Sequence, residues 1–251
     1  MKLLTIILIL SFSFSAQAAN EIDAKLKAAM TAESRPQAHI DRDKNRKPLA
    51  TLNFFRLKDN MRVLELIPGG GWYTRLLAPV LAENGKFYVA IGTNYVKQNI
   101  IGKPNFEKIG LLESSENVNR NDWYRYITQH AEQDDFDFGV NELDMILTFR
   151  NLHNFGKEVR QMMNVQVFEA LKHGGYYGVV DHTRRHMEKE NNENGRRIDP
   201  VLVIKEMMDI GFEFVDYSDL HFRADDELEY EVGRRSVSGN TDRFTMLFRK
   251  P

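Results

Sequence analysis

The chain has 251 residues, of which 42% are hydrophobic and 28% are charged, and its formal net charge is -2. This composition is typical of a globular protein that can bury a core of its own, and it provides no general basic surface for binding nucleic acid. The sequence contains no cysteine, which excludes disulfides, thiolate catalysis and zinc sites with cysteine ligands.

The first 18 residues have the pattern of a signal peptide. Lys2 precedes an apolar run that is too short for a comfortable membrane span, and Ala16-Gln17-Ala18 has the small-x-small form of a signal-peptidase site. Cleavage would give a periplasmic or secreted protein with no stable membrane insertion. An uncleaved membrane anchor is the alternative interpretation.

Residues 19–50 are expected to form an N-terminal arm ahead of a main domain at residues 51–251. The arm is polar and charged, with one possible short helix around residues 22–30. By composition alone, such a segment is most simply a solvated one.

Strand-type and helix-type patterns alternate in the main domain, which predicts a parallel α/β sheet. Strands are expected at the apolar runs of residues 61–67, 86–92, 143–149 and 176–181, and possibly at residues 124–128. Helices are expected at residues 51–57, at 72–83 with a stop at Asn84-Gly85, and in a ragged region after the second strand.

The second half of the domain continues the alternation and then changes it. An amphipathic helix at residues 159–171 is expected to end at Gly174-Gly175, and Asp199-Pro200 is expected to open a helix that ends at Gly211. Two last strands, at residues 212–220 and 243–250, have a charged insertion between them and no helix. This favours an antiparallel hairpin at the edge of a sheet with six or seven strands.

A glycine-rich turn follows the first strand. Glu65 lies near the end of that strand, and Pro68-Gly69-Gly70-Gly71 precedes the next helix. Glycines in such a turn let a ligand lie against the backbone, and the helix start offers free N–H groups. Glu65 could accept a hydrogen bond from an amine or hydroxyl. A tight turn with a capping carboxylate is the alternative explanation.

Polar side chains also follow two later strands. Arg150, Asn151, His153 and Asn154 come after residues 143–149, and Asp181, His182 and His186 come after residues 176–181. Ligands of open parallel sheets bind at the carboxyl ends of the strands, so the two groups are expected to converge. Each residue alone has an ordinary explanation as loop polarity, helix capping or a surface histidine.

In these residues the sequence resembles the class I S-adenosylmethionine-dependent methyltransferase superfamily, and more closely an exported branch identified as predicted methyltransferases. The matching segments are RKP at 46–48, VLELIPGGGWYTRLLAP at 63–79, LTFRNLHN at 147–154, LKHGGYYGVVDH at 171–182 and DRFTMLFRKP at 242–251. The resemblance implies a Rossmann-like α/β fold with a mostly parallel seven-stranded sheet and an antiparallel last strand. It also implies that S-adenosylmethionine is the cofactor, with Glu65, Gly69 and Gly71 around its methionine part and Gly70 in the same turn.

The first functional hypothesis is therefore a methyltransferase acting on a small molecule or an envelope component. His153 or His182 could be the base, because an imidazole titrates near neutrality, and Arg150 could hold an anionic substrate group. Asp181 and Asn151 complete the candidate catalytic set. Trp72 or Tyr73 could pack against the sulfonium or the substrate, although an aromatic residue after a turn is more often part of the core.

Two alternatives stay open. His153, Asp181, His182 and His186 could serve metal-assisted hydrolysis, but no HExxH-type spacing supports a metal site and none is expected. The chain could also be a ligand-binding or accessory protein that keeps the fold without methyl transfer. The second strand ends in Ile91-Gly92-Thr93, where the superfamily usually has an acidic residue that holds the ribose, and this favours the accessory role.

Two further positions can be compared with the superfamily pattern. Ile67 stands where the superfamily turn usually has a glycine, and His130-Ala131 with Glu132 is the nearest match to an acid that contacts adenine.

The expected partner is a small-molecule ligand and not a nucleic acid. The arm is expected to pack over the strand ends as a lid, with Arg42 or Arg46 facing the pocket.

Overall fold

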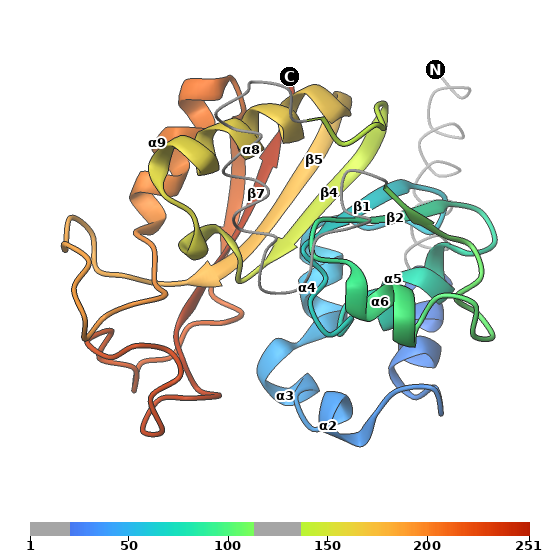
Figure 1. Cartoon of the computed structure of the whole chain (residues 1–251), viewed down its shortest axis with the longest axis horizontal. Coiled ribbons are helices and arrows are strands. Elements are labelled where there is room, and N and C mark those ends of the chain that lie inside the picture. The colour runs from blue at the N-terminus through green and yellow to red at the C-terminus, as the bar shows by residue number, and fades with distance from the viewer. Residues whose placement is uncertain (1–20, 113–136) are drawn as a thin grey trace, which may run out of the picture.

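The computed structural model describes residues 21–112 and 137–251, and a seven-stranded sheet lies at its centre (Figure 1). The strands are β1 (Arg62–Leu66), β2 (Lys86–Ala90), β3 (Ile109–Leu111), β4 (Leu143–Phe149), β5 (Leu171–His182), β6 (Glu213–Ser218) and β7 (Arg243–Arg249). They lie in the order β3-β2-β1-β4-β5-β7-β6. Strand β7 runs antiparallel to both of its neighbours, β5 and β6, and the other neighbouring strands are parallel to one another. The predicted sheet, mostly parallel with an antiparallel last strand, is confirmed.

Helices precede, connect and cover these strands. They are α2 (Gln37–Ile40), α3 (Asp43–Arg46), α4 (Pro48–Phe54), α5 (Thr74–Leu81), α6 (Asn94–Asn99), α8 (Lys157–Ala170) and α9 (Pro200–Ile210), with a 3-10 turn η2 at Leu152–Asn154. Residues 21–30 are helical as well, as the sequence predicts. In Figure 1, α8 and α9 lie together on the same side of the sheet.

The sheet is buried on both faces. Successive strand residues point to opposite sides, so Val63 and Leu147 pack with α4, α5 and the first helix of the arm, whereas Leu64 and Ile146 pack with α8 and α9. This explains why the central strands read as continuous apolar runs rather than as alternating ones.

Helix α9 begins and ends where the sequence predicts. The Asp199 side chain accepts a hydrogen bond from the Val201 N–H at 2.8 Å, Pro200 occupies the first helical position, and Gly211 ends the helix with a φ of 117°. The predicted bounds of β4, residues 143–149, are also confirmed.

The prediction that Gly174-Gly175 ends a helix is wrong. Helix α8 ends at Ala170, and both glycines lie inside β5, where the pairing with β4 shifts register. Gly174 has a φ of 78°, and a Cβ on Gly175 would lie 2.9 Å from the carbonyl oxygen of Leu143. The two glycines therefore allow an irregularity in the strand.

The third strand of the sheet is β3 at residues 109–111, which pairs with β2. The expected strand at residues 124–128 lies outside the described residues. The helix predicted from residue 72 begins two residues later, at Thr74, because Gly71 to Tyr73 still belong to the turn.

The arm packs against the main domain through its backbone carbonyl groups. Several side chains of the domain donate to them, among them Trp72 Nε1 to His39 at 3.0 Å, His221 Nε2 to Arg46 at 3.0 Å, and Arg243 Nη2 to Asn45 at 2.7 Å. These bonds place α2 and α3 at the carboxyl ends of the strands, beside the loops that precede β7 (Figure 1).

An alanine at Gly178 is expected to lower the free energy of unfolding by about 1–3 kcal/mol. Its Cβ would lie 2.7 Å from Leu147 Cδ2 and 2.8 Å from Phe55 Cγ, so packed core side chains would have to move. Urea denaturation followed by circular dichroism measures the change. Gly195→Ala is the matched control, because the nearest atom to its Cβ is Glu231 Cγ at 3.6 Å. Equal stabilities of the two variants would contradict this packing.

Candidate functional site

The turn between β1 and α5 leaves open space beside two of its three glycines. Gly69 and Gly71 have φ angles of 56° and 70°, which other residues adopt rarely. A Cβ added to Gly69 or Gly70 would meet no atom within 4 Å, whereas a Cβ on Gly71 would lie 2.2 Å from Ile100 Cδ1. Gly71 is therefore required by packing, and Gly69 and Gly70 leave room for a ligand against the backbone.

Glu65 lies buried near the end of β1, beneath this turn. Its Oε2 accepts a hydrogen bond from Thr74 Oγ1 at 2.6 Å. Burial raises the pKa of Glu65 to about 7, against the opposing effects of the Thr74 hydrogen bond and the positive charge of Arg46. The carboxyl group therefore changes its charge near neutral pH.

Trp72 and Tyr73 are both buried in the core. The Trp72 ring is covered by Arg46, whose guanidinium carbon lies 4.5 Å from the ring centroid. Tyr73 stacks on Phe149 with 3.5 Å between ring centroids and 9° between ring planes. Both rings thus support the site from within the protein, and their faces are occupied by protein side chains.

Three strand ends have residues other than glycine in the left-handed region. Ile67, Ile91 and Arg150 follow β1, β2 and β4 directly, and their φ angles are 54°, 65° and 65°. Such a backbone costs about 1–3 kcal/mol per residue and is found most often at functional sites. This backbone is thus repeated at three neighbouring strand ends, beside the candidate site.

His153 and Asp181 form a close pair between the ends of β4 and β5. His153 Nδ1 lies 2.5 Å from Asp181 Oδ1, and the His153 backbone N–H donates to Asp181 Oδ2 at 3.2 Å. Because an ionised carboxylate only accepts hydrogen bonds, Nδ1 carries a proton, so the neutral form of the ring has its free lone pair on Nε2. The two groups predicted from the sequence therefore converge as a histidine oriented by a carboxylate.

His182 lies next to this pair, with its ring centroid 5.5 Å from that of His153. Its Nδ1 lies 3.0 Å from Thr241 Oγ1. Burial, together with the positive charges of His153 and Arg150, holds the pKa of His182 well below its ordinary value. His182 is therefore a neutral hydrogen-bonding group at physiological pH.

Asn151 ties the loop after β4 to the turn after β1. Its Nδ2 donates to the Leu66 carbonyl at 3.2 Å and to Thr148 Oγ1 at 3.1 Å, with the Ile67 carbonyl at 3.5 Å. The amide is thus used inside the protein, and it fixes the position of the loop that carries His153 relative to the glycine turn.

A polar cavity of about 490 Å³ lies over the ends of β4 and β5. Arginines line it from several separate segments. Its lining is Arg42, Arg46, Arg150, His153, Asn154, His182, Arg196, Val232, Gly233, Ser238, Gly239, Thr241 and Arg243. The arm thus contributes both Arg42 and Arg46, the two residues predicted from the sequence to face the pocket.

His186 is not part of the His153 group. Its Nδ1 lies 2.9 Å from Asp199 Oδ2 at the start of α9, and its side chain is largely exposed. Across residues 21–112 and 137–251, no group of three or more His, Cys, Asp or Glu side chains could hold a metal ion. The structure therefore gives no support to metal-assisted hydrolysis by these residues.

The end of β2 carries no carboxylate, as the sequence indicates. Ile91 and Thr93 are buried there, and Gly92 has a φ of 63°. His130 and Glu132, the nearest match to an adenine contact, lie outside the described residues.

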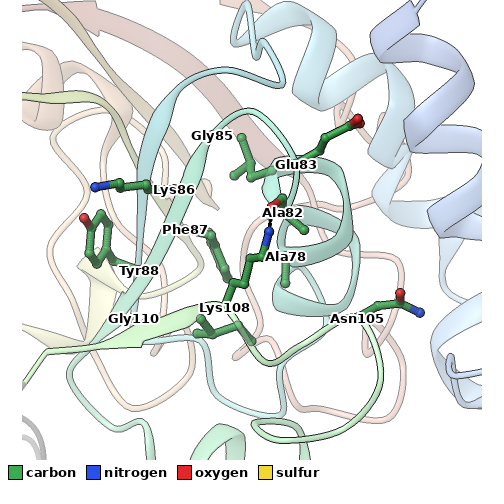
Figure 2. A pocket seen from close by; sticks show the side chains of 12 residues that line it. Ala78, Ala82, Glu83, Gly85, Lys86, Phe87, Tyr88, Asn105, Lys108 and Gly110 are labelled. Carbon is green, nitrogen blue, oxygen red and sulfur yellow. Dashed lines mark hydrogen bonds between the residues drawn. The ribbon is translucent and has the colours of Figure 1, made fainter.

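A second cavity, of about 310 Å³, lies away from these strand ends (Figure 2). It lies beside the first residues of β2 and the end of α5, where Lys108 Nζ donates to the carbonyl of Ala82 at 2.8 Å. His153 and His182 line the arginine-lined cavity and not this one, so the arginine-lined cavity is the candidate site. The glycine turn lines neither of these two cavities.

Sequence reasoning missed Thr241 and Arg243, and one signal could have found them. Because the last strand was expected to be antiparallel, its first residue must lie beside the carboxyl ends of the parallel strands. The structure shows this register, with Arg243 opposite His182. Arg196, from the long loop after β5, had no comparable signal.

No protein-family model and no curated protein matches the chain. Solved structures do match it. An S-adenosylmethionine-dependent methyltransferase from Aquifex aeolicus has a TM-score of 0.58 at 17% identity, covering 91% of this chain and 98% of its own. The [4+2]-cyclase SpnF has a TM-score of 0.52 at 14% identity, with 82% and 80% covered. The glycopeptide N-methyltransferase MtfA has a TM-score of 0.51 at 14% identity, with 83% and 97% covered.

Within the described ranges, no helix has the length and apolar character needed to cross a membrane. The strand order and the solved structures that match together show that the chain has the fold of S-adenosylmethionine-dependent methyltransferases.

Proposed function

We propose that the protein is an S-adenosylmethionine-dependent methyltransferase that acts on a small molecule or an envelope component. The observation that carries the proposal is the link made by Asn151. Its hydrogen bonds to the backbone after β1 hold the loop of the histidine base next to the glycine turn. A base fixed beside a ligand-accepting turn is the arrangement that methyl transfer requires, since the reaction depends mainly on positioning.

The turn fits the methionine part of the cofactor. Gly69 and Gly70 face open space, and Glu65 lies beneath them as a buried carboxyl group. These residues and Gly71 would hold that part of the molecule, with Glu65 near its ammonium group. When bound, S-adenosylmethionine supplies a methyl group on a sulfonium, which is a strong electrophile.

His153 would act on the acceptor. An acceptor hydroxyl or amine that gains a methyl group must lose a proton, and that proton needs a base within hydrogen-bond reach. Because Asp181 binds the Nδ1 side of the ring, the Nε2 side is available, and His153 lines the cavity. Asp181 holds the ring in this tautomer and stabilises the positive charge that the ring acquires.

A second candidate function is ligand binding or another reaction without methyl transfer. The observation that favours it is the end of β2, where Ile91-Gly92-Thr93 offers no carboxylate to a ribose. The fold does not require methyl transfer either, since SpnF is described as a [4+2]-cyclase. Cofactor binding separates the two candidates.

We also propose that the protein is exported, on the basis of the signal-type pattern of residues 1–18. Expression of the full chain in a bacterium with an envelope should yield a periplasmic species that begins at Ala19, because cleavage follows Ala18. Intact-mass spectrometry of the periplasmic and cytoplasmic fractions tests this. A full-length chain confined to the cytoplasm would contradict export.

Calorimetric titration of the folded protein with S-adenosylmethionine and with its demethylated product should show binding of both. Gly70→Leu should weaken binding of the product by about tenfold or more, because the new side chain would fill the open space beside the turn. Its melting temperature should stay close to that of the wild type, since no atom lies within 4 Å of the new Cβ.

The matched control is Gly195→Ala, which lies outside the turn and should bind like the wild type. A folded protein that gives no heat with either compound would exclude methyl transfer and leave the second candidate function. Equal affinities of the wild type and Gly70→Leu would remove the turn from the cofactor site.

Glu65 should make the protein less stable as pH rises through its titration. The native carboxyl has a pKa of about 7, above its ordinary value of 4.5, so the native state binds a proton more tightly than the unfolded chain does. The free energy of unfolding should therefore fall by about 3 kcal/mol relative to Glu65→Gln as pH rises from about 4.5 to 7. Urea denaturation of both proteins across this range measures it. The exposed Glu158→Gln is the control, and parallel curves for the wild type and Glu65→Gln would contradict the prediction.

A further inference from the structure

The arginine-lined cavity is unbalanced in charge. Arg42 and Arg46 come from the arm, Arg150 from the end of β4, and Arg243 from the start of β7. Within the described part of the chain, none of these four arginines forms an ion pair, and no Asp or Glu lines the cavity. Several guanidinium groups thus share one cavity, and the nearby carboxyl groups of Glu65 and Asp181 act on Arg46 and Arg150 only as charges, without an ion pair in the described structure.

Arg46 and Arg243 are held firmly in place. Arg46 lies against the Trp72 ring, and its Nε is buried without a hydrogen-bond partner in the described structure. Arg243 donates to the carbonyls of Asn45 and Thr241, the first at 2.7 Å. These positions are fixed by packing and therefore do not depend on a ligand to form.

The guanidinium groups of Arg42 and Arg150 do not hold the fold together, because no side-chain hydrogen bond within the described residues uses them. Arg42 nevertheless lies close to the loop before β7, since a Cβ on Gly239 would come within 2.7 Å of its Nη1. Arg150 is held by its backbone N–H, which donates to the Val180 carbonyl at 2.7 Å. Their guanidinium groups are therefore available to a ligand.

This arrangement carries an electrostatic cost. Burial, together with the neighbouring arginines, lowers the pKa of Arg46 to about 9 and that of Arg243 to about 10. The hydroxyl of Tyr73 is the shared favourable neighbour of Arg46, Arg150 and Arg243. A neutral hydroxyl cannot offset several positive charges, and among these arginines Asp181 acts only on Arg150, so the cavity keeps an excess of positive charge.

We propose that this cavity binds a compact polyanion, either a diphosphate or a polycarboxylate, which forms part of the methyl acceptor. The planar guanidinium fork binds phosphate and carboxylate oxygens in pairs, and several forks around one space select multiply charged groups. A cavity of about 490 Å³ has the size of a small-molecule site. The statement that the anion is part of the methyl acceptor rests on the proposed function, whereas the statement that the cavity binds a polyanion rests on the cavity alone.

The position of His153 connects the anion to the chemistry. His153, Arg150 and His182 line the same cavity, so a polyanion held by the arginines would lie beside the candidate base. Neutral His182 adds a hydrogen-bonding group without a further charge. The acceptor is thus expected to carry its anionic groups a short distance from the hydroxyl or amine that is methylated.

Isothermal titration of the whole protein with pyrophosphate at low ionic strength tests the proposal. The wild type should bind pyrophosphate with a micromolar dissociation constant, and neutral glycerol should not bind. Arg150→Gln and Arg42→Gln should each weaken pyrophosphate binding by about tenfold or more, since each removes a charge-assisted contact. A parallel titration with citrate distinguishes a phosphate site from a carboxylate site.

Arg249→Gln is the matched control, because it removes the same charge at the opposite edge of the sheet, where Arg249 pairs with Glu213. Its affinity should stay within about twofold of the wild type. Thermal melting of each variant checks that it is folded, and Arg150→Lys should recover only part of the binding lost in Arg150→Gln.

Three results would overturn the proposal. They are no pyrophosphate or citrate binding by the wild type, unchanged binding by both cavity variants, or an equal loss in Arg249→Gln. A separate titration with the demethylated cofactor product tests the proposed function independently of polyanion binding. Product binding without polyanion binding would exclude this inference and keep methyl transfer, whereas polyanion binding alone would keep the cavity and exclude methyl transfer.

Discussion

The buried carboxylate of Asp181 is the interaction on which the geometry of the candidate site depends. It accepts hydrogen bonds from the His153 ring, the His153 backbone N–H and the His182 backbone N–H, so it joins the loop after β4 to the end of β5. A buried carboxylate is stable only when such donors surround it. The requirement to satisfy Asp181 therefore fixes the position of His153, and the tautomer of that ring follows from the same bond.

The same bonds leave Asp181 unable to balance the rest of the cavity. Its oxygens are occupied by His153 and His182, and it acts on Arg150 only as a nearby charge. Arg46 and Arg243 are oriented by aromatic and carbonyl contacts instead. The negative charge thus positions the His153 ring, and the positive charges stay available for a ligand. Under the proposed function, this arrangement would separate proton transfer from substrate binding within one cavity.

The sequence could predict elements whose ends have local signals. The cap at Asp199, the stop at Gly211 and the apolar run of β4 all lie where the patterns indicate, and the convergence of two strand ends followed from parallel topology. The prediction that Gly174-Gly175 ends a helix is wrong because a glycine pair has the same local pattern at a helix end and in a strand irregularity. Only the pairing of β5 with β4 distinguishes the two, and pairing is a long-range property.

The two sides of the proposed site differ in the contacts that they offer. Ile67 adopts a left-handed backbone at a conformational cost, at a position where the superfamily that the sequence resembles usually has glycine. The end of β2 also keeps a left-handed backbone, at Ile91, but has no carboxylate. On the side proposed for the cofactor, the backbone therefore leaves room for a ligand but offers no carboxylate at the end of β2. The charged groups lie on the side proposed for the acceptor, where the arm and the start of β7 add arginines to the strand ends. Binding energy at this site is thus expected to come mainly from the anionic partner, with the cofactor held by shape.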